Sequence, residues 1–218
     1  MYELTLIQKI AVFIVPVLFA ITLHEVAHGY VASLFGDQTA KFSGRLSLNP
    51  IHHIDLLGTI VVPLLMLLAT NFIFGWAKPV PVDPRNLHNP RRDMAFVALA
   101  GPGANLLMAI FWGLMLKIGM LAAVNDMLTI GIPLIYMGKA GIMINVVLAV
   151  LNFIPLPPLD GSKILSSLLP PHMAYKYNQI EPYGIFILVL LMLTNVLSTI
   201  MTPIIFFFLS LINTLLGI

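Results

Sequence analysis

The most constraining feature of the sequence is a pair of histidines inside a long apolar segment. Between residues 4 and 35, the only residues with charged side chains are Lys9 and Glu25. His24, Glu25 and His28 form an H-E-x-x-H pattern in this segment. In a helix, His24 and His28 lie one turn apart on one face, where two imidazoles can share one Zn²⁺ with the glutamate beside them as a general base. The pattern therefore predicts a metal site on a membrane-embedded helix.

The composition supports this interpretation. Of the 218 residues, 59% are hydrophobic and only 9% are charged, whereas soluble domains carry about 25% charged residues. We therefore expect an integral, multi-pass protein whose partner is the lipid bilayer. Ionisable groups at membrane depth are costly and usually functional. A polar patch that merely joins two helices is the alternative, but it does not require this spacing.

Cysteine and net charge restrict the chemistry further. The chain has no cysteine, so a bound metal must be held by histidine or carboxylate side chains. The net charge of +2 gives no reason to expect a nucleic-acid partner.

Hydropathy predicts an all-α polytopic fold with about five or six transmembrane helices. The expected apolar helices cover residues 5–35, 94–123, 130–154, 183–197 and 200–216. The alternation of residue types in 41–48 predicts short membrane-associated β-strands. Residues 59–76 are apolar but interrupted by Pro63 and Asn71, and we expect this segment to be re-entrant.

The distribution of basic residues supports re-entry of 59–76. With that topology, eight basic residues face one side of the membrane and three face the other, which predicts a cytoplasmic location for the first group. The eight are Lys41, Arg45, Lys78, Arg85, Arg91, Arg92, Lys163 and Lys176, and the three are Lys9, Lys117 and Lys139. If 59–76 spans the membrane instead, this bias weakens.

A third ligand is needed, because a catalytic zinc usually has three protein ligands and an open position for water. Asp160 is the strongest candidate, since it follows a predicted spanning helix at a proline-rich break and lies on the same side as the histidine pair. Asp55, next to His52 and His53, is a rival. Adjacent histidines point in different directions, so we expect His52 and His53 to be interfacial residues rather than ligands.

Three motifs in this order resemble the signatures of the site-2 proteases, a family of intramembrane zinc metalloproteases. They are His24-Glu25-x-x-His28, Gly101-x-x-x-Asn105 and Asn152-x-x-Pro155-x-Pro157-x-Leu159-Asp160-Gly161. The segments GRLSLNPIHHID and GWAKPVPVDP further resemble the small prokaryotic branch that lacks PDZ and CBS domains. The resemblance covers about residues 15–165.

The resemblance implies one zinc per chain, bound by His24, His28 and Asp160, with Glu25 as general base and acid. Asn105 and Asn152 could then contact the substrate or orient a ligand. The alternatives are that Asn105 joins two helices beside small residues and that Asn152 has a structural role at the helix break. The resemblance also implies transmembrane protein substrates, a prokaryotic cell membrane and an active site near the cytoplasmic face. The expected organisation is a single domain over residues 1–218, with a catalytic core at about 5–165 and accessory helices at about 182–217; no oligomeric state follows from it.

Two other functions compete with proteolysis. A relative that binds membrane helices without cutting them would have no use for Glu25 beside the histidines. A metal transporter would be expected to carry acidic or histidine residues on several spanning helices, and the predicted helices at 94–123 and 183–217 carry none.

Overall fold

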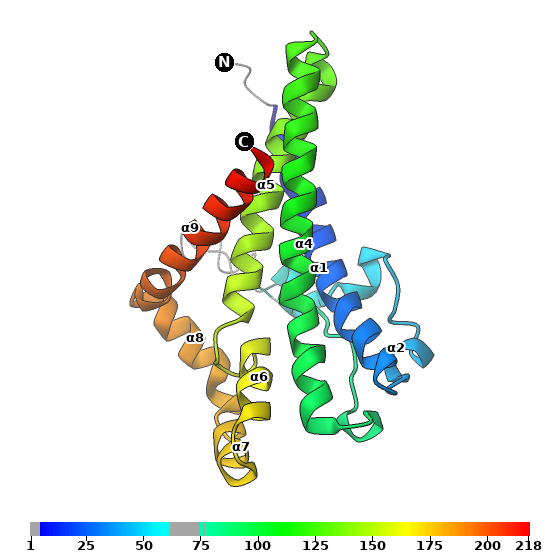
Figure 1. Ribbon diagram of the computed structural model, residues 1–218, viewed down its shortest axis with the longest axis vertical. Helices are drawn as coiled ribbons and strands as arrows, with labels where there is room; N and C mark the ends of the chain where they lie inside the picture. Colours follow the sequence, from blue (N-terminus) through cyan, green and yellow to red (C-terminus); the bar gives the residue numbers. More distant parts are fainter. Residues whose placement is uncertain (1–4, 62–74, 76) are drawn as a thin grey trace.

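The computed structural model describes residues 5–61, 75 and 77–218, and every regular element in this part of the chain is helical (Figure 1). The α-helices are α1 (Leu6–Leu34), α2 (Thr39–Phe42), α4 (Pro90–Val124), α5 (Leu128–Asn152), α6 (Asp160–Leu168), α7 (Pro171–Asn178), α8 (Gly184–Leu193) and α9 (Val196–Leu216). Shorter turns are the 3₁₀-helices η1 (Pro50–His53), η3 (Pro84–Asn86) and η4 (Glu181–Tyr183) and the π-helix η2 (Leu56–Val61). The all-α prediction is confirmed for the described residues.

Within the described residues, four helices are long and apolar enough to cross a membrane: α1 over its stretch Ile10–Leu34, α4, α5 and α9. A helix of 25 residues, such as α5, is about 37 Å long at 1.5 Å per residue, compared with a hydrocarbon core of about 30 Å. The chain is therefore a multi-pass integral membrane protein.

One of the two apolar helices expected near the C-terminus is too short to span a membrane. The predicted helix at 183–197 is α8, which has 10 residues and a length of only about 15 Å. The chain then turns at Asn195, which has a left-handed backbone with φ of 58°, before α9 begins. A polar residue that adopts this conformation readily therefore divides one hydrophobic stretch into two helices.

The predicted strands at 41–48 are wrong for the described residues. Part of this stretch is the short helix α2, and the remainder is irregular after a turn at Gly44 with φ of +64°. Phe42, an apolar residue of the alternating pattern, is 85% exposed, so the alternation does not correspond to a buried and an exposed face. The re-entrant prediction falls mainly on 62–74 and 76, which lie outside the described residues.

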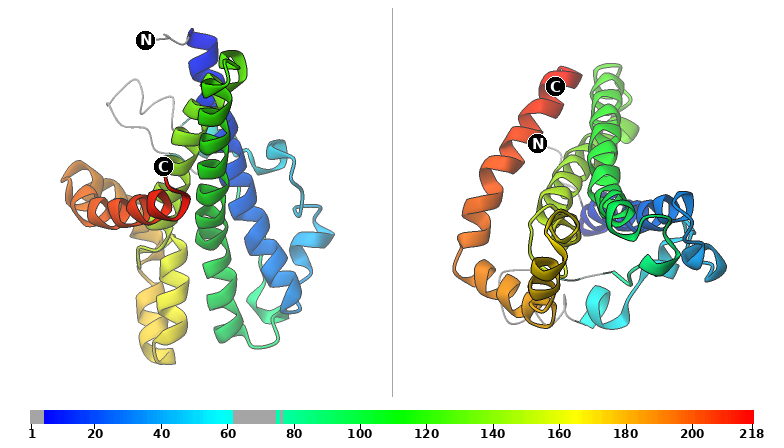
Figure 2. Two further views of the ribbon diagram at one scale, coloured as in Figure 1. Left: turned by 45° about the horizontal axis from the view of Figure 1, so that its top comes forward. Right: turned by 60° about the horizontal axis from the view of Figure 1, so that its bottom comes forward.

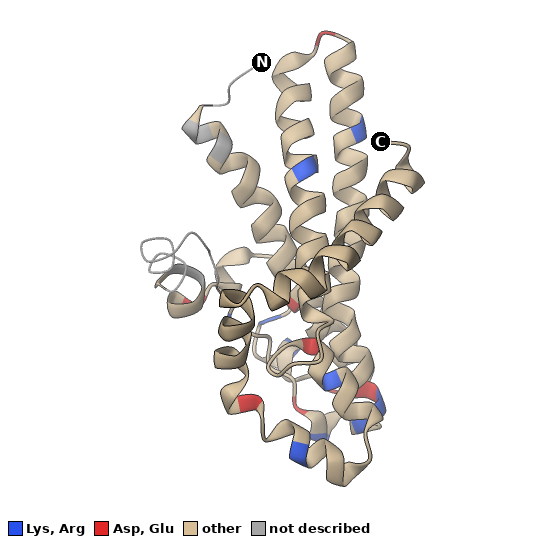
Figure 3. Cartoon of the chain, turned by 90° about the vertical axis from the view of Figure 1, so that its left-hand side faces the viewer, with Lys and Arg blue, Asp and Glu red and all other residues tan. Residues whose placement is uncertain are grey.

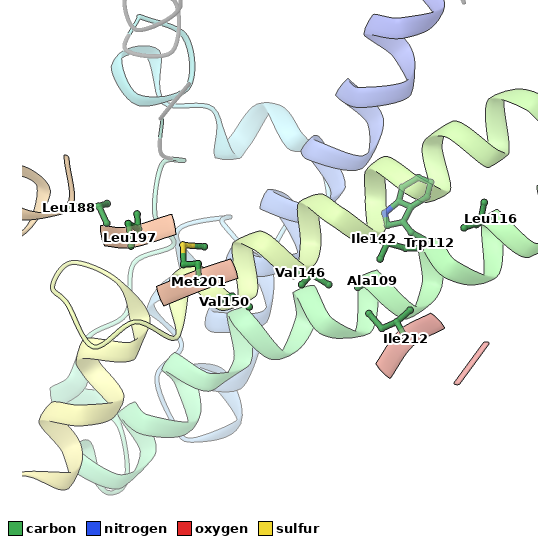
Figure 4. Packing of buried hydrophobic residues seen from close by; sticks show 10 residues of the cluster. All are labelled: Ala109, Trp112, Leu116, Ile142, Val146, Val150, Leu188, Leu197, Met201 and Ile212. Atoms are coloured by element: carbon green, nitrogen blue, oxygen red, sulfur yellow. The ribbon is translucent and has the colours of Figure 1, made fainter. Parts of the chain in front are cut away.

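Helices α4 and α5 form the centre of the bundle (Figures 1 and 2). Small residues let the two helices approach closely: a Cβ added at Gly138 of α5 would lie 2.7 Å from the Cα of Leu116 on α4. Farther along, Trp112 of α4 occupies the space that a side chain at Gly141 would need. The apolar core continues from this contact toward α9 (Figure 4).

Two elements pack on the central pair. Helix α1 contacts both α4 and α5, and α9 crosses the pair on another side (Figure 2). The ammonium of Lys117 on α4 donates a hydrogen bond of 2.6 Å to the carbonyl of Leu216, at the C-terminal end of α9. A cation at this position satisfies a helix-end carbonyl and interacts favourably with the helix dipole.

An extended segment, residues 77–83, crosses α1. Its first part is held by a hydrogen bond of 3.0 Å from the Lys78 amide to the His53 carbonyl. Its end is held by the buried carboxylate of Asp37, which accepts from the Asp83 amide at 2.8 Å and from the Asn86 side chain at 3.1 Å. The segment is thus fixed at both ends beside the helix that carries the histidines.

The close approach of α4 and α5 leads to a stability prediction. Gly138→Ala should lower the free energy of unfolding by about 1–3 kcal/mol, because the new methyl group meets backbone atoms of α4 that cannot rotate away. Thermal unfolding of purified protein in detergent measures the change. Gly103→Ala on α4 is the control, since a Cβ there meets nothing within 4 Å. Equal melting temperatures for the two variants would contradict the close contact.

Candidate metal centre

Three side chains from two distant helices meet at one point. The Nε2 atoms of His24 and His28 on α1 lie 3.0 Å apart, and each lies 3.1 Å from Oδ2 of Asp160 on α6. The three residues are buried, with 5–8% of their surface exposed. Among the described residues, these three form the group able to share a metal ion.

The chemistry of the three atoms fits a cation. His24 and His28 each place Nδ1 against an oxygen acceptor, so each Nδ1 carries the hydrogen of the neutral ring and each Nε2 presents a lone pair. Two lone pairs and a carboxylate oxygen thus converge without a proton between them. Ligand atoms of a tetrahedral zinc, with bonds of about 2.0–2.1 Å, are about 3.3–3.4 Å apart. The observed spacing is close to this value.

Helix α4 supplies both acceptors that orient the imidazoles. The Nδ1 of His28 donates to the carbonyl oxygen of Val97 at 2.7 Å, and the Nδ1 of His24 donates to Oδ1 of Asn105 at 2.6 Å. Partners of this kind fix the ring orientation of metal-binding histidines. The side chain of Asn105 therefore contacts His24 directly, and its role in orienting a ligand stays a prediction.

Gly101 provides the space for this arrangement. A Cβ at this position would lie 2.6 Å from Nε2 of His24 and would also overlap Nε2 of His28. Any side chain here would occupy the region between the two imidazoles, where a metal ion would sit. The absence of a side chain at Gly101 thus lets α4 approach α1 and keeps the ligand atoms accessible.

Asp160 reaches the histidines because α6 begins at this residue. Leu159 before it is extended, and the N-terminal turn of a helix favours a carboxylate. Gly161 allows the sharp return of the chain, because a Cβ there would lie 2.5 Å from the Ile154 carbonyl oxygen.

Glu25 faces the extended segment 77–83. Its Oε2 accepts a hydrogen bond of 2.8 Å from the Val80 amide. Val80 itself packs closely on α1, because a Cβ at Gly29 would lie 2.8 Å from its side chain. The carboxylate is half-buried and has one oxygen held by the protein backbone. No pattern in the sequence indicates this contact, because the two residues are 55 positions apart.

The remaining predicted residues lie elsewhere. The amide of Asn152 donates to Leu148 of its own helix at 3.0 Å, so its role at the substrate stays a prediction. Asp55 is not part of the metal-binding group and accepts from the Gly58 amide at 2.7 Å. His53 is buried, and its Nε2 lies 2.8 Å from the Ser47 carbonyl, outside that group.

Sequence reasoning missed one buried polar residue near the centre. Asn145 on α5 is fully buried and accepts a hydrogen bond of 3.0 Å from Asn105. It is one of the two asparagines of the apolar helix α5, and it lies outside every recognised motif. Only the rarity of amides in a spanning segment could have drawn attention to it.

The clearance at Gly101 predicts an effect on metal binding. Gly101→Ala should weaken Zn²⁺ binding by at least about 10-fold, because its methyl group enters the space between the ligand atoms; loss of a partner to metal ligands costs about 10–100-fold. Isothermal titration calorimetry in detergent measures the affinity. Gly103→Ala, with open space at its Cβ, should bind zinc as the unsubstituted protein does. Equal weakening in both variants would mean that helix flexibility, and not clearance, controls affinity.

Known proteins are similar in sequence to this chain over most of its length. Residues 12–195 match the family model described as Peptidase family M50. The chain is 40% identical over 193 residues to the Bacillus subtilis (strain 168) protein named "Putative zinc metalloprotease YwhC", covering 87% of this chain and 84% of that one.

More distant relatives carry the same description. Rip2 of Mycolicibacterium smegmatis is 28% identical over 199 residues, covering 88% of this chain and 71% of that one. Rip2 of Mycobacterium tuberculosis (strain H37Rv) is 27% identical over 182 residues, covering 83% and 66%. No solved structure matches the chain significantly. The family match and the 40% identity, together with two imidazoles and a carboxylate converging between membrane-length helices, establish that the chain belongs to the M50 family of zinc metalloproteases.

Proposed function

We propose that this metalloprotease is an intramembrane endopeptidase that hydrolyses peptide bonds in or near transmembrane segments of membrane proteins. His24, His28 and Asp160 hold one zinc, and Glu25 is the general base and acid. The observation that carries the proposal is the triangle of three acceptor atoms, 3.0–3.1 Å on each side, buried among helices long enough to span a membrane.

Zinc with three such ligands supplies an activated water and polarises the carbonyl group of the scissile bond. The residues of the chain do the remaining work. Glu25 accepts the proton of the attacking water and returns it to the nitrogen of the leaving amine. The Val80 amide holds one carboxylate oxygen of Glu25 at 2.8 Å, which fixes the carboxylate during this transfer and leaves the other oxygen to take the proton.

The position of the site restricts the substrate. The backbone amides of a transmembrane helix are occupied by internal hydrogen bonds, so cleavage requires an unwound, extended stretch. We place this stretch beside the extended segment 77–83, where backbone pairing of the β-augmentation kind can hold it. This segment is fixed by Asp37 at one end and by the His53 carbonyl at the other, so it is already ordered for such pairing.

The distribution of charge supports a cytoplasmic location for the site. Most lysine and arginine residues gather at the end of the bundle where α6 and α7 lie, whereas Lys117 and Lys139 lie along the spanning helices (Figure 3). An excess of basic residues marks the cytoplasmic side. Asp160 is the first residue of α6, so the proposed centre lies toward that face of a prokaryotic cell membrane.

Glu25→Gln separates catalysis from metal binding. The variant should keep one zinc per chain, because Glu25 is not a ligand in this proposal. Its rate of cleavage should fall at least about 100-fold, since a positioned general base contributes about 10²–10⁴-fold to the rate. Cleavage of a fluorescent transmembrane substrate in proteoliposomes and the zinc content of the same sample give both quantities. Unchanged cleavage removes Glu25 from the mechanism, and absence of cleavage in the unsubstituted protein favours a relative that binds helices without cutting them.

The identity of the third ligand is tested by zinc stoichiometry. Asp160→Ala should lose bound zinc, because two imidazoles alone hold the ion weakly and the open carboxylate position admits water. Asp55→Ala should retain one zinc per chain. Metal analysis after dialysis against a weak chelator gives the ratio. Retention of zinc by Asp160→Ala together with its loss from Asp55→Ala would reverse the assignment.

A further inference from the structure

A continuous path of buried amides leads from the metal centre to α5. The Nδ1 of His24 donates to Oδ1 of Asn105 at 2.6 Å, and Nδ2 of Asn105 donates to Oδ1 of Asn145 at 3.0 Å. The Nδ2 of Asn145 donates to the carbonyl of Gly141, one turn earlier on α5, at 2.9 Å. Both asparagines have no exposed surface. The path therefore joins three helices through two fully buried amides.

The Gly141 carbonyl, at the end of the path, determines which group donates and which accepts in every hydrogen bond of the path. A backbone carbonyl only accepts, so the NH₂ group of Asn145 must face Gly141 and its oxygen must face Asn105. Asn105 in turn must donate to Asn145, and its other N–H donates to the Ala20 carbonyl at 3.1 Å. Its oxygen is then left for His24. The hydrogen of the His24 ring is thereby placed on Nδ1, and the lone pair is placed on Nε2.

We infer that Asn145 is a positioning residue for the metal centre, acting on the ligand His24 through Asn105. This inference rests on the proposed role of His24 as a zinc ligand. Within the described part of the chain, the Asn145 side chain is hydrogen-bonded to Asn105 and to the Gly141 carbonyl and not to His24, His28 or Asp160. One N–H of the Asn105 side chain donates to the Ala20 carbonyl, and the other donates to Asn145. Because both N–H groups are bonded in this way, the oxygen of Asn105 stays directed at His24.

A purely structural role is the competing explanation. Asparagine side chains commonly join helices in membranes, where they are buried and bonded across helix interfaces. Such a role would change the stability of the bundle but would have no particular dependence on Asn105. Coupling between the two asparagines in zinc affinity therefore separates the two roles, and a double-mutant cycle measures that coupling.

The experiment compares Zn²⁺ dissociation constants of four proteins in detergent: unsubstituted, Asn145→Leu, Asn105→Leu and the double variant. Leucine keeps a similar volume and removes all polar atoms. We expect Asn145→Leu to weaken zinc binding about 10-fold, the lower end of the usual 10–100-fold effect of partners behind a ligand. In the Asn105→Leu background, the same change should have no further effect, because the path is already broken.

Asn213→Leu is the matched control. It replaces the same residue type on another spanning helix, α9, where the residue is exposed, and it should leave zinc affinity unchanged. If Asn145→Leu does not fold, Asn145→Ser replaces it in the cycle, since serine keeps a small polar group at this position.

Three outcomes overturn the inference. They are a dissociation constant for Asn145→Leu within 2-fold of the unsubstituted protein, additive losses in the double variant, and an equal loss in Asn213→Leu. The zinc affinity of the unsubstituted protein is a separate result. If that protein binds no zinc, the proposed function fails; if it binds zinc and the cycle shows no coupling, only the role of Asn145 fails.

Discussion

The structure depends on satisfying three acceptor atoms that have been removed from water. Two imidazole nitrogens and a carboxylate oxygen lie 3.0–3.1 Å apart in a buried position, and such groups are costly unless a cation or a proton is shared among them. Helix α6 begins at Asp160, which places the carboxylate beside the two imidazoles. The need to satisfy these groups also determines which face of α1 is turned toward α4, because the acceptors for both Nδ1 atoms belong to that helix.

Absence of a side chain is as important here as the ligands themselves. Gly101 leaves open the space between the imidazoles, and Gly161 lets the chain return past the Ile154 carbonyl so that Asp160 can enter. Both glycines belong to motifs that also contain a polar residue of the proposed site. The short spacing within each motif thus has a physical reason: one residue provides the clearance and another, close in sequence, provides the contact.

The sequence predicted the parts of the site that local patterns encode. His24 and His28 share a helical face, and Asp160 follows a proline-rich helix end, so each could be found from its neighbours. The strands at 41–48 were wrong because alternation alone does not supply a pairing partner, and the chain forms α2 and a turn at Gly44. Asn145 was missed because its partner, Asn105, is 40 residues away on another helix, and no spacing rule joins them.

The contact between Glu25 and Val80 shows why a motif of five residues is incomplete by itself. Pro79 and Pro81 have no N–H group, so Val80 carries the only backbone donor among these three residues, and it is directed at the Glu25 carboxylate at 2.8 Å. The prolines also keep the segment extended and disfavour a helix there. A stretch that looks like a linker in the sequence therefore completes the surroundings of the proposed general base, and the functional unit includes α1, α4, α5, α6 and the segment 77–83.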